Sequence, residues 1–152
     1  MLVATDRART GYRNVVVAVD LSDVSRRTLR AAAALFPDQR LTVFHAFDVP
    51  YASLMNNPSA NDAQYRQAAH ADTTAFVQIT GLPERDRARL DVVVDKGDPE
   101  RVLQHLVRSS RVDLVVLGSH GRGPVAGALL GSVVKRIAVA LPCDALVLRD
   151  WA

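Results

Sequence analysis

Short apolar runs alternate with amphipathic stretches along most of the chain. Runs rich in β-branched and other apolar residues predict five buried strands, at residues 14–19, 41–47, 90–95, 113–117 and 145–148. Apolar residues at helical spacing lie between them and predict helices over about 22–35, 62–79, 98–107 and 132–140, with a short helical turn near 125–130. This alternation predicts a three-layer, doubly wound, Rossmann-like α/β fold with a parallel sheet and helices on both faces.

Local signals mark the ends of several of these helices. Ser22 is a predicted N-cap, because its hydroxyl can accept a hydrogen bond from an amide of the first turn. Asp98 is predicted to cap a second helix, with Pro99 at the first helical position, where an N–H is not needed. Pro37 and Pro142 are predicted to end the helices that precede them.

Two segments lack this periodicity. Residues 1–13 are polar and charged and predict an N-terminal arm in front of one domain over 14–150. Residues 48–62 (DVPYASLMNNPSAND) predict a long loop, either a functional lid or a disordered segment.

The composition fits a buried parallel sheet, and the single cysteine favours a reducing compartment. Of the 152 residues 49% are hydrophobic and 5% aromatic, so the core has to be built from Val, Leu, Ile and Ala. A single cysteine, Cys143, excludes an intramolecular disulfide and is interpreted as a small buried apolar residue. The sequence shows no signal peptide and no membrane-length segment, so we expect a cytoplasmic protein that does not enter the membrane. The net charge of +3 comes from scattered arginines, which indicates a solvated surface rather than a nucleic-acid site.

The main chemical signal is a glycine-rich segment after the fourth strand. Leu117 ends that strand, Gly118, Ser119, His120 and Gly121 follow, and Gly131-Ser132 begins the next long helix. Glycine lets the backbone approach an anion closely, and free N–H groups at a helix start, here Ser132 and Val133, can bind phosphate oxygens. A glycine cluster alone is more typical of a turn, but the second break favours a phosphate cradle. The segment fits neither a Walker A loop nor the dinucleotide fingerprint.

Asp20 directly follows the first predicted strand. If the first and fourth strands are neighbours where the strand order reverses, Asp20 and the glycine segment share one crevice. Its carboxylate has two interpretations: it caps the following helix, or it binds a ribose hydroxyl or, through a water, Mg²⁺.

Two other polar residues, Arg122 and His120, also allow two interpretations. Arg122 either contacts phosphate or faces solvent, and His120 either braces the loop or acts as a ligand or acid–base group. His45 lies within an apolar strand and is interpreted as a core histidine with a hydrogen-bond partner.

Together these residues resemble a known family. The spacing G-x2-G-x9-G-[S/T], met here by Gly118, Gly121, Gly131 and Ser132, resembles the nucleotide-binding signature of the universal stress proteins. The resemblance extends to VVVAVDLSDVSRRTL, LTVFHAFDV, VDKGDPERVLQHL and GSVVKRIAVALPCDALVLR, and is poorest over residues 48–82.

The resemblance implies a five-stranded parallel sheet in the order 3-2-1-4-5, counted along the chain, with ATP and Mg²⁺ at the switch point. It implies phosphate binding at Gly121, Arg122, Gly131 and Ser132, and ribose and α-phosphate near Gly118 and Asp20. Adenine would lie near Ala18 and the main chain of Ala46, and Val19 is a further nucleotide-binding residue. It also implies a homodimer through the last strand, at Ala145, Leu146, Val147 and Leu148.

The expected function is therefore that of an ATP-binding regulatory or stress-response protein. ATP hydrolysis is expected to be slow at most, because no residue is evident that would activate water. One alternative is an interaction module of the same fold that binds no nucleotide. Another is a nucleotidyl transferase or ligase, but the residues after the first strand, DLSDVS, match neither H-x-G-H nor S-G-G-x-D-S.

Overall fold

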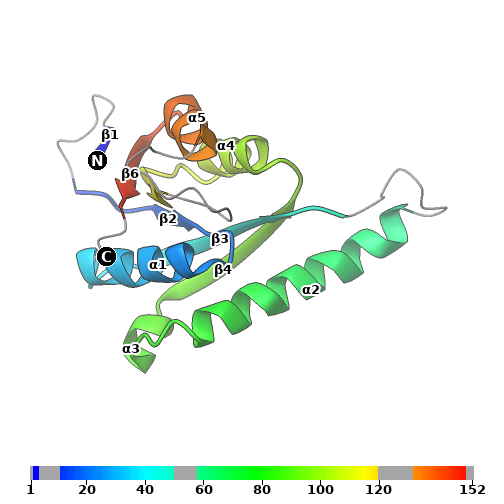
Figure 1. Ribbon diagram of the computed structural model, residues 1–152, viewed down its shortest axis with the longest axis horizontal. Coiled ribbons are helices and arrows are strands. Elements are labelled where there is room, and N and C mark those ends of the chain that lie inside the picture. Colours follow the sequence, from blue (N-terminus) through cyan, green and yellow to red (C-terminus); the bar gives the residue numbers. More distant parts are fainter. Residues whose placement is uncertain (1, 4–10, 50–57, 120–131, 150–152) are drawn as a thin grey trace.

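The computed structural model describes residues 2–3, 11–49, 58–119 and 132–149, and in this part of the chain six strands form one sheet (Figure 1). The strands are β1 (Leu2–Val3), β2 (Val15–Ala18), β3 (Leu41–Phe47), β4 (Leu90–Lys96), β5 (Leu114–Gly118) and β6 (Asp144–Leu148). The helices are α1 (Asp23–Leu35), α2 (Pro58–Gln78), α3 (Glu84–Arg87), α4 (Pro99–Ser109) and α5 (Ser132–Ala140).

The order of strands across the sheet is β1-β6-β5-β2-β3-β4. The five strands from β2 to β6 are parallel and lie in the predicted order, so the predicted fold class is confirmed. The sixth strand, β1, was not predicted: Leu2 and Val3 lie within the segment expected to be an arm, and they pair antiparallel with β6.

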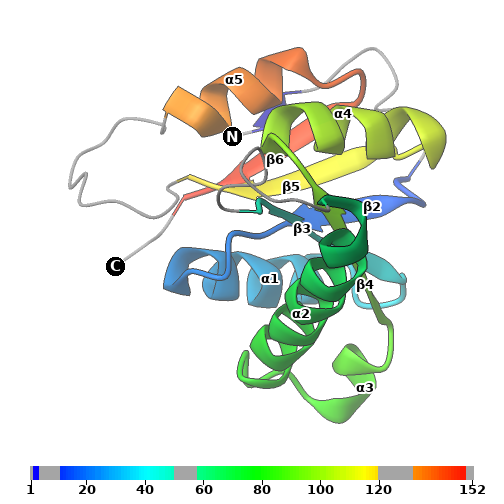
Figure 2. The same ribbon diagram turned by 90° about the vertical axis from the view of Figure 1, so that its right-hand side faces the viewer.

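Helices cover both faces of the sheet, with α1 and α2 on one face and α4 and α5 on the other (Figure 2). Alternate residues of β2 point to opposite faces, as in any strand. Val15 and Val17 pack with Leu29 of α1 in one core cluster, whereas Val16 packs with Leu103 of α4 in the other. The uninterrupted apolar runs of the sequence thus reflect strands that are buried on both sides.

The predicted helix caps are confirmed. The side chain of Ser22 accepts a hydrogen bond from the amide of Ser25 at 3.2 Å, and α1 begins one residue later. The carboxylate of Asp98 accepts one from the amide of Arg101 at 3.1 Å, with Pro99 opening α4.

The start of α2 corrects the sequence analysis. Residues 58–62 were predicted to be loop but belong to α2, and the rest of the predicted loop from residue 50 to 57 lies outside the described residues. The helix was hard to delimit because its described buried face is small, with Ala69, Thr73, Phe76 and Val77 as its buried residues. Thr73 is fully buried and donates its hydroxyl proton to the carbonyl of Ala69 at 2.7 Å. The four-residue helix α3 was not predicted.

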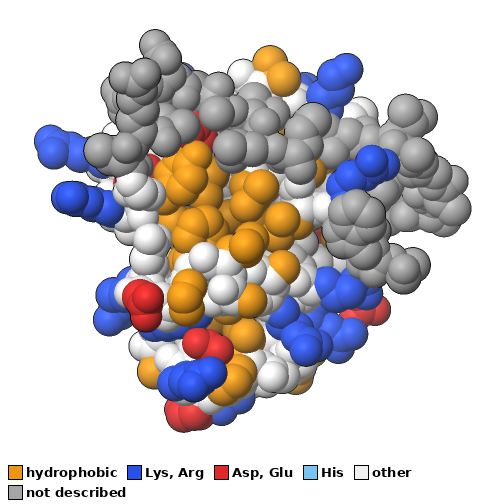
Figure 3. Space-filling view, turned by 90° about the vertical axis from the view of Figure 1, so that its left-hand side faces the viewer, with side chains coloured by type: hydrophobic (Ala, Val, Ile, Leu, Met, Phe, Trp, Pro, Cys, Tyr) orange, Lys and Arg blue, Asp and Glu red, His pale blue; other side chains and the backbone are white. Residues whose placement is uncertain are grey.

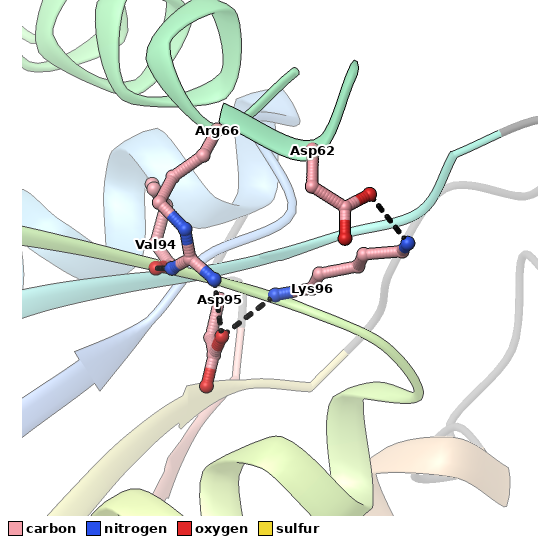
Figure 4. Close-up of polar contacts among 5 residues, drawn as sticks. All are labelled: Asp62, Arg66, Val94, Asp95 and Lys96. Atoms are coloured by element: carbon pink, nitrogen blue, oxygen red, sulfur yellow. Dashed lines mark hydrogen bonds and ion pairs between the residues drawn. The ribbon is translucent and has the colours of Figure 1, made fainter. Parts of the chain in front are cut away.

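Ion pairs attach α2 to the edge strand β4 (Figure 4). Arg66 donates to the carbonyl of Val94 at 2.8 Å and pairs with Asp95 at 3.1 Å. Lys96 pairs with Asp62 at 2.7 Å, one helical turn from Arg66. These contacts compensate for the small apolar face of α2 and give a carbonyl of the sheet edge a hydrogen-bond donor.

Arg89 binds the C-terminal end of α1. Its guanidinium donates to the carbonyls of Ala33 and Phe36, both at 2.6 Å, and to that of Gln39 at 2.8 Å. It also pairs with Asp86 at 3.1 Å, and its side chain is only 13% exposed. The last turn of α1 contains no basic residue of its own, so Arg89 supplies the positive charge that a helix C-terminus favours.

We expect Arg89→Met to lower the free energy of unfolding by about 2–3 kcal/mol, because three carbonyls lose a charged donor while the aliphatic stem stays. Urea unfolding followed by circular dichroism measures the change. Arg85→Met, at an exposed residue of α3, is the matched control and should change stability by less than about 0.5 kcal/mol. Equal effects of the two substitutions would contradict the role assigned to Arg89.

Candidate functional site

The strand order reverses between β2 and β5. From β2 the chain proceeds to β3 and β4 on one side of the sheet, and it then crosses to β5 on the other side. β2 and β5 pair in parallel, with Val17 opposite Val116, so their carboxyl ends emerge side by side. Open α/β sheets bind ligands in the crevice that such a reversal creates.

Asp20 lies directly beyond the end of β2 and organises the turn into α1. Its Oδ1 atom accepts hydrogen bonds from the hydroxyl of Ser25 at 2.6 Å and from the amide of Ser22 at 3.1 Å. The Ser25 hydroxyl oxygen in turn accepts from the amide of Asp20 at 3.0 Å. Leu21, between them, has a φ of 61°, a strained value for leucine that this network maintains. The carboxylate therefore braces the turn before α1, whereas the N-cap of α1 is Ser22 and not Asp20.

Ser25 is the residue of this turn that the sequence analysis missed. It is 6% exposed and bridges the backbone and the side chain of Asp20. The signal was present in the sequence as a serine three residues after the N-cap, on the face of the helix that turns toward the strand.

Gly118 ends β5 where α1 crosses it. A Cβ atom on Gly118 would lie 2.8 Å from Oγ1 of Thr28 and 2.9 Å from Cγ1 of Val24, closer than side chains tolerate. Thr28 is held in place, since its hydroxyl donates to the Val24 carbonyl at 2.9 Å. Gly118 is thus needed for the close approach of α1 to β5. The next residue, Ser119, is buried, and its amide donates to the carbonyl of Leu148 at 2.9 Å.

The other end of the glycine signature opens α5. Ser132 is the first residue of α5, and both Ser132 and Val133 are exposed. Figure 2 shows that α5 begins at the same end of the sheet at which β5 finishes. His120, Gly121, Arg122 and Gly131 lie outside the described residues.

Small side chains line the ends of β2 and β3 on the face that α5 covers. Ala18 and Ala46 are half-buried and pack against the same core cluster as the buried Leu117. Val19 points to the opposite core cluster, and its amide donates to the carbonyl of Phe44 at 2.9 Å. The sheet therefore presents small apolar side chains near the carboxyl ends of β2 and β3.

His45 is a half-buried residue of β3 with a backbone partner. Its Nδ1 atom lies 3.0 Å from the carbonyl oxygen of Val19. This contact fits the interpretation of His45 as a structural histidine and ties the ends of β2 and β3 together.

Cys143 is not a nucleophile in this environment. Burial raises the pKa of its thiol from 9.0 to about 11, and the nearby carboxylates of Asp144 and Asp113 add to the effect. The thiol thus stays protonated at neutral pH. Among the described residues, no three acidic, histidine or cysteine side chains are grouped so that they could hold a metal ion.

The doubly wound sheet, with β2 and β5 adjacent where the strand order reverses, defines an α/β domain of the Rossmann-like class. The model of the universal stress protein family matches residues 11–149, and the chain belongs to this family. A curated relative from Thermus aquaticus, a universal stress protein encoded in the 3′ region of a QAH/OAS sulfhydrylase gene, is 27% identical over 142 residues. The alignment covers 91% of this chain and 99% of the relative.

Solved structures share the fold. A universal stress protein crystallised in complex with cAMP has a TM-score of 0.63 and 26% identity, with 91% of this chain and 98% of that chain covered. A family member from Arabidopsis thaliana with AMP bound has a TM-score of 0.61 and 18% identity, with 92% and 93% covered. In the part of this chain that the structure describes, no helix combines the length and apolarity that a membrane span requires.

We expect Gly118→Ala to lower the free energy of unfolding by roughly 1–3 kcal/mol, because the new methyl group overlaps two β-branched side chains of α1. In a Val24→Ala/Thr28→Ala background, which removes both contacting atoms, the same substitution should cost less than about 0.5 kcal/mol. A double-mutant cycle by urea unfolding measures the coupling. An equal cost in both backgrounds would show that Gly118 is not required for packing.

Proposed function

We propose that this chain binds an adenine nucleotide, ATP with Mg²⁺, at the carboxyl ends of β2, β3 and β5. The observation that carries the proposal is the spacing G-x2-G-x9-G-S, which begins at the end of β5 beside the switch point and ends at the first residue of α5. Two features of the fold support the proposal: the carboxyl ends of β2 and β5 lie side by side, and the first residues of α5 are exposed. The relative crystallised with cAMP, at 26% identity, supports an adenine nucleotide as the ligand class.

Each part of the ligand has a proposed position. The adenine would lie on the strip formed by Ala18 and Ala46, whose small side chains leave room for a planar ring. The ribose and α-phosphate would lie near Gly118 and Asp20. The outer phosphates would be held by amides and side chains of the signature, at Gly121, Arg122, Gly131, Ser132 and Val133.

Mg²⁺ would be held mainly by the phosphates. It usually binds nucleotides through phosphate oxygens, waters and one or two carboxylates. Asp20 is the carboxylate closest in sequence to the proposed site on β2, but its Oδ1 atom already accepts two hydrogen bonds. Contact through a water leaves these bonds intact, and Mg²⁺ would neutralise phosphate charge without displacing the turn.

The proposed role is regulatory. Phosphoryl transfer needs an oriented nucleophile. Neither His45, held by the Val19 carbonyl, nor Asp20, held in its turn, is placed to activate water. Hydrolysis is therefore proposed to be slow at most, and nucleotide occupancy to select the conformation that cytoplasmic partners bind.

We also propose that the chain forms a homodimer through β6, at Ala145, Leu146, Val147 and Leu148. The place of β6 supports this: it is the outermost of the five parallel strands on its side, with the two-residue β1 beyond it. A two-fold axis beside an outer strand joins two sheets into one.

Mass spectrometry of the small molecule that denaturation releases from the purified protein tests the ligand class, and we expect an adenine nucleotide.

Adding ATP and Mg²⁺ should raise the melting temperature, by a stabilisation of about 2.7 kcal/mol at 100 times the Kd. Gly121→Val and Gly131→Val should abolish this gain while the protein still melts cooperatively without nucleotide. Side chains at these positions would occupy the place of the phosphates.

Gly11→Val is the matched control, because Gly11 is exposed and a Cβ atom there meets nothing within 4 Å. This variant should gain as much from ATP as the parent does. If Gly121→Val and Gly131→Val also gain as much as the parent, the nucleotide does not lie in the signature. No gain in any of the proteins, together with no released nucleotide, would favour an interaction module without a ligand.

A further inference from the structure

The N-terminal strand β1 lies along the edge of the sheet that the proposed homodimer needs. It pairs antiparallel with β6, Leu2 opposite Leu146 and Val3 opposite Ala145. Among the described residues the pairing covers Leu2 and Val3, whereas β6 is five residues long. A second copy of the chain could pair with this edge of β6 only after β1 has left it.

β1 has the direction and the sequence that strand β6 of a second copy of the chain would have at this edge. Two copies related by a two-fold axis pair their edge strands antiparallel. With the axis beside Leu146, Leu146 of the second copy lies opposite Leu146, and Val147 of the second copy lies opposite Ala145. β1 places Leu2 and Val3 in those two positions, so it presents the same Leu-Val dipeptide in the same direction and register.

The surface beside this edge also favours a larger partner than β1. Leu146 and Leu148 are half-buried apolar side chains on the face of the sheet that α1 covers, and α1 packs on β5 and β2. Figure 3 views the molecule from the side on which β6 lies in Figure 1, and hydrophobic side chains gather near the centre of that side. A second sheet continuing from β6 would extend over more of this surface than two residues can.

The sequence of β6 contains little that would protect a bare edge. Natural edge strands are usually blunted by lysines, prolines or bulges. β6 reads Asp-Ala-Leu-Val-Leu, and its one charged residue, Asp144, is buried and accepts a hydrogen bond from the Tyr12 hydroxyl at 2.8 Å. Pairing with β1 is therefore the edge protection that the described structure provides.

We propose that β1 is an intramolecular copy of the partner strand, which competes with a second copy of the chain for the β6 edge and so sets the monomer–dimer equilibrium. This inference rests on the homodimer proposed above and adds that β1 controls its formation. A segment tethered to the same chain acts at an effective concentration in the millimolar range, which opposes dimerisation at lower protein concentrations. In the described part of the chain β1 pairs through Leu2 and Val3, and a second copy that displaces β1 has to replace these pairs.

Analytical ultracentrifugation of the full chain over a range of concentrations tests this. Leu2→Gly/Val3→Pro weakens β1, since glycine disfavours strands and proline removes an N–H. We expect this variant to dimerise with a Kd at least about tenfold lower than that of the parent. Thr5→Gly/Asp6→Pro introduces the same residue types outside β1 and should behave like the parent.

Three results would overturn the inference, and they differ in what they say about the dimer. Equal dimerisation of parent and β1 variant would keep the homodimer but remove the control by β1. Weaker dimerisation of the β1 variant would mean that β1 joins the two copies instead of keeping them apart. Monomers in every case would remove both the homodimer and its control.

Disulfide formation tests the register independently. Directly opposite residues of an antiparallel pair have Cα atoms about 4.5–5.5 Å apart, within the range that a disulfide spans. With Leu146→Cys in both chains, diamide as the oxidant should cross-link the β1 variant at least about tenfold faster than the chain with intact β1. The native Cys143 is buried with a pKa of about 11 and should not compete. Equal rates of cross-linking would contradict the competition.

Discussion

The parallel pairing of β2 with β5 is the constraint on which the rest of this structure depends. It brings the carboxyl ends of strands about a hundred residues apart in sequence to one edge, with Val17 opposite Val116. It also requires α1 to cross β5 closely, and only a glycine at position 118 leaves room for Thr28 and Val24 there. One residue thus belongs both to the packing of the core and to the signature of the proposed nucleotide site.

The sequence predicted the elements whose signals are local. The β-branched runs identified the five parallel strands, of which β2, β3, β5 and β6 are largely buried, whereas Val94 is the buried residue of the edge strand β4. Ser22 and Asp98 identified two helix starts through their side-chain oxygens. The start of α2 was missed, since a helix held partly by the ion pairs of Arg66 and Lys96 does not need a strong apolar repeat. β1 was missed because its pairing with a strand over 140 residues away leaves no pattern in a two-residue segment.

The site was predictable to the extent that topology determines it. Alternation of strands and helices implied a switch point, and the structure places β2 and β5 together there. The hydrogen bonds by which Asp20 braces its own turn were missed, because they depend on Ser25, whose position three residues after the N-cap was the one local signal for them. Where the glycine signature runs through residues 120–131, the nucleotide site remains a prediction from the sequence.

Amide chemical shifts of the isotopically labelled protein, titrated with ATP and Mg²⁺, test whether a nucleotide binds at the switch point between β2 and β5. We expect the amides of Gly118, Ser119, Ser132 and Val133 to shift together and to saturate at one concentration, while those of Val93 in the edge strand β4 and of His70 in α2 do not move. Shifts confined to the α2–β4 edge, or no shifts at millimolar ATP, would contradict a nucleotide site at the β2–β5 switch point.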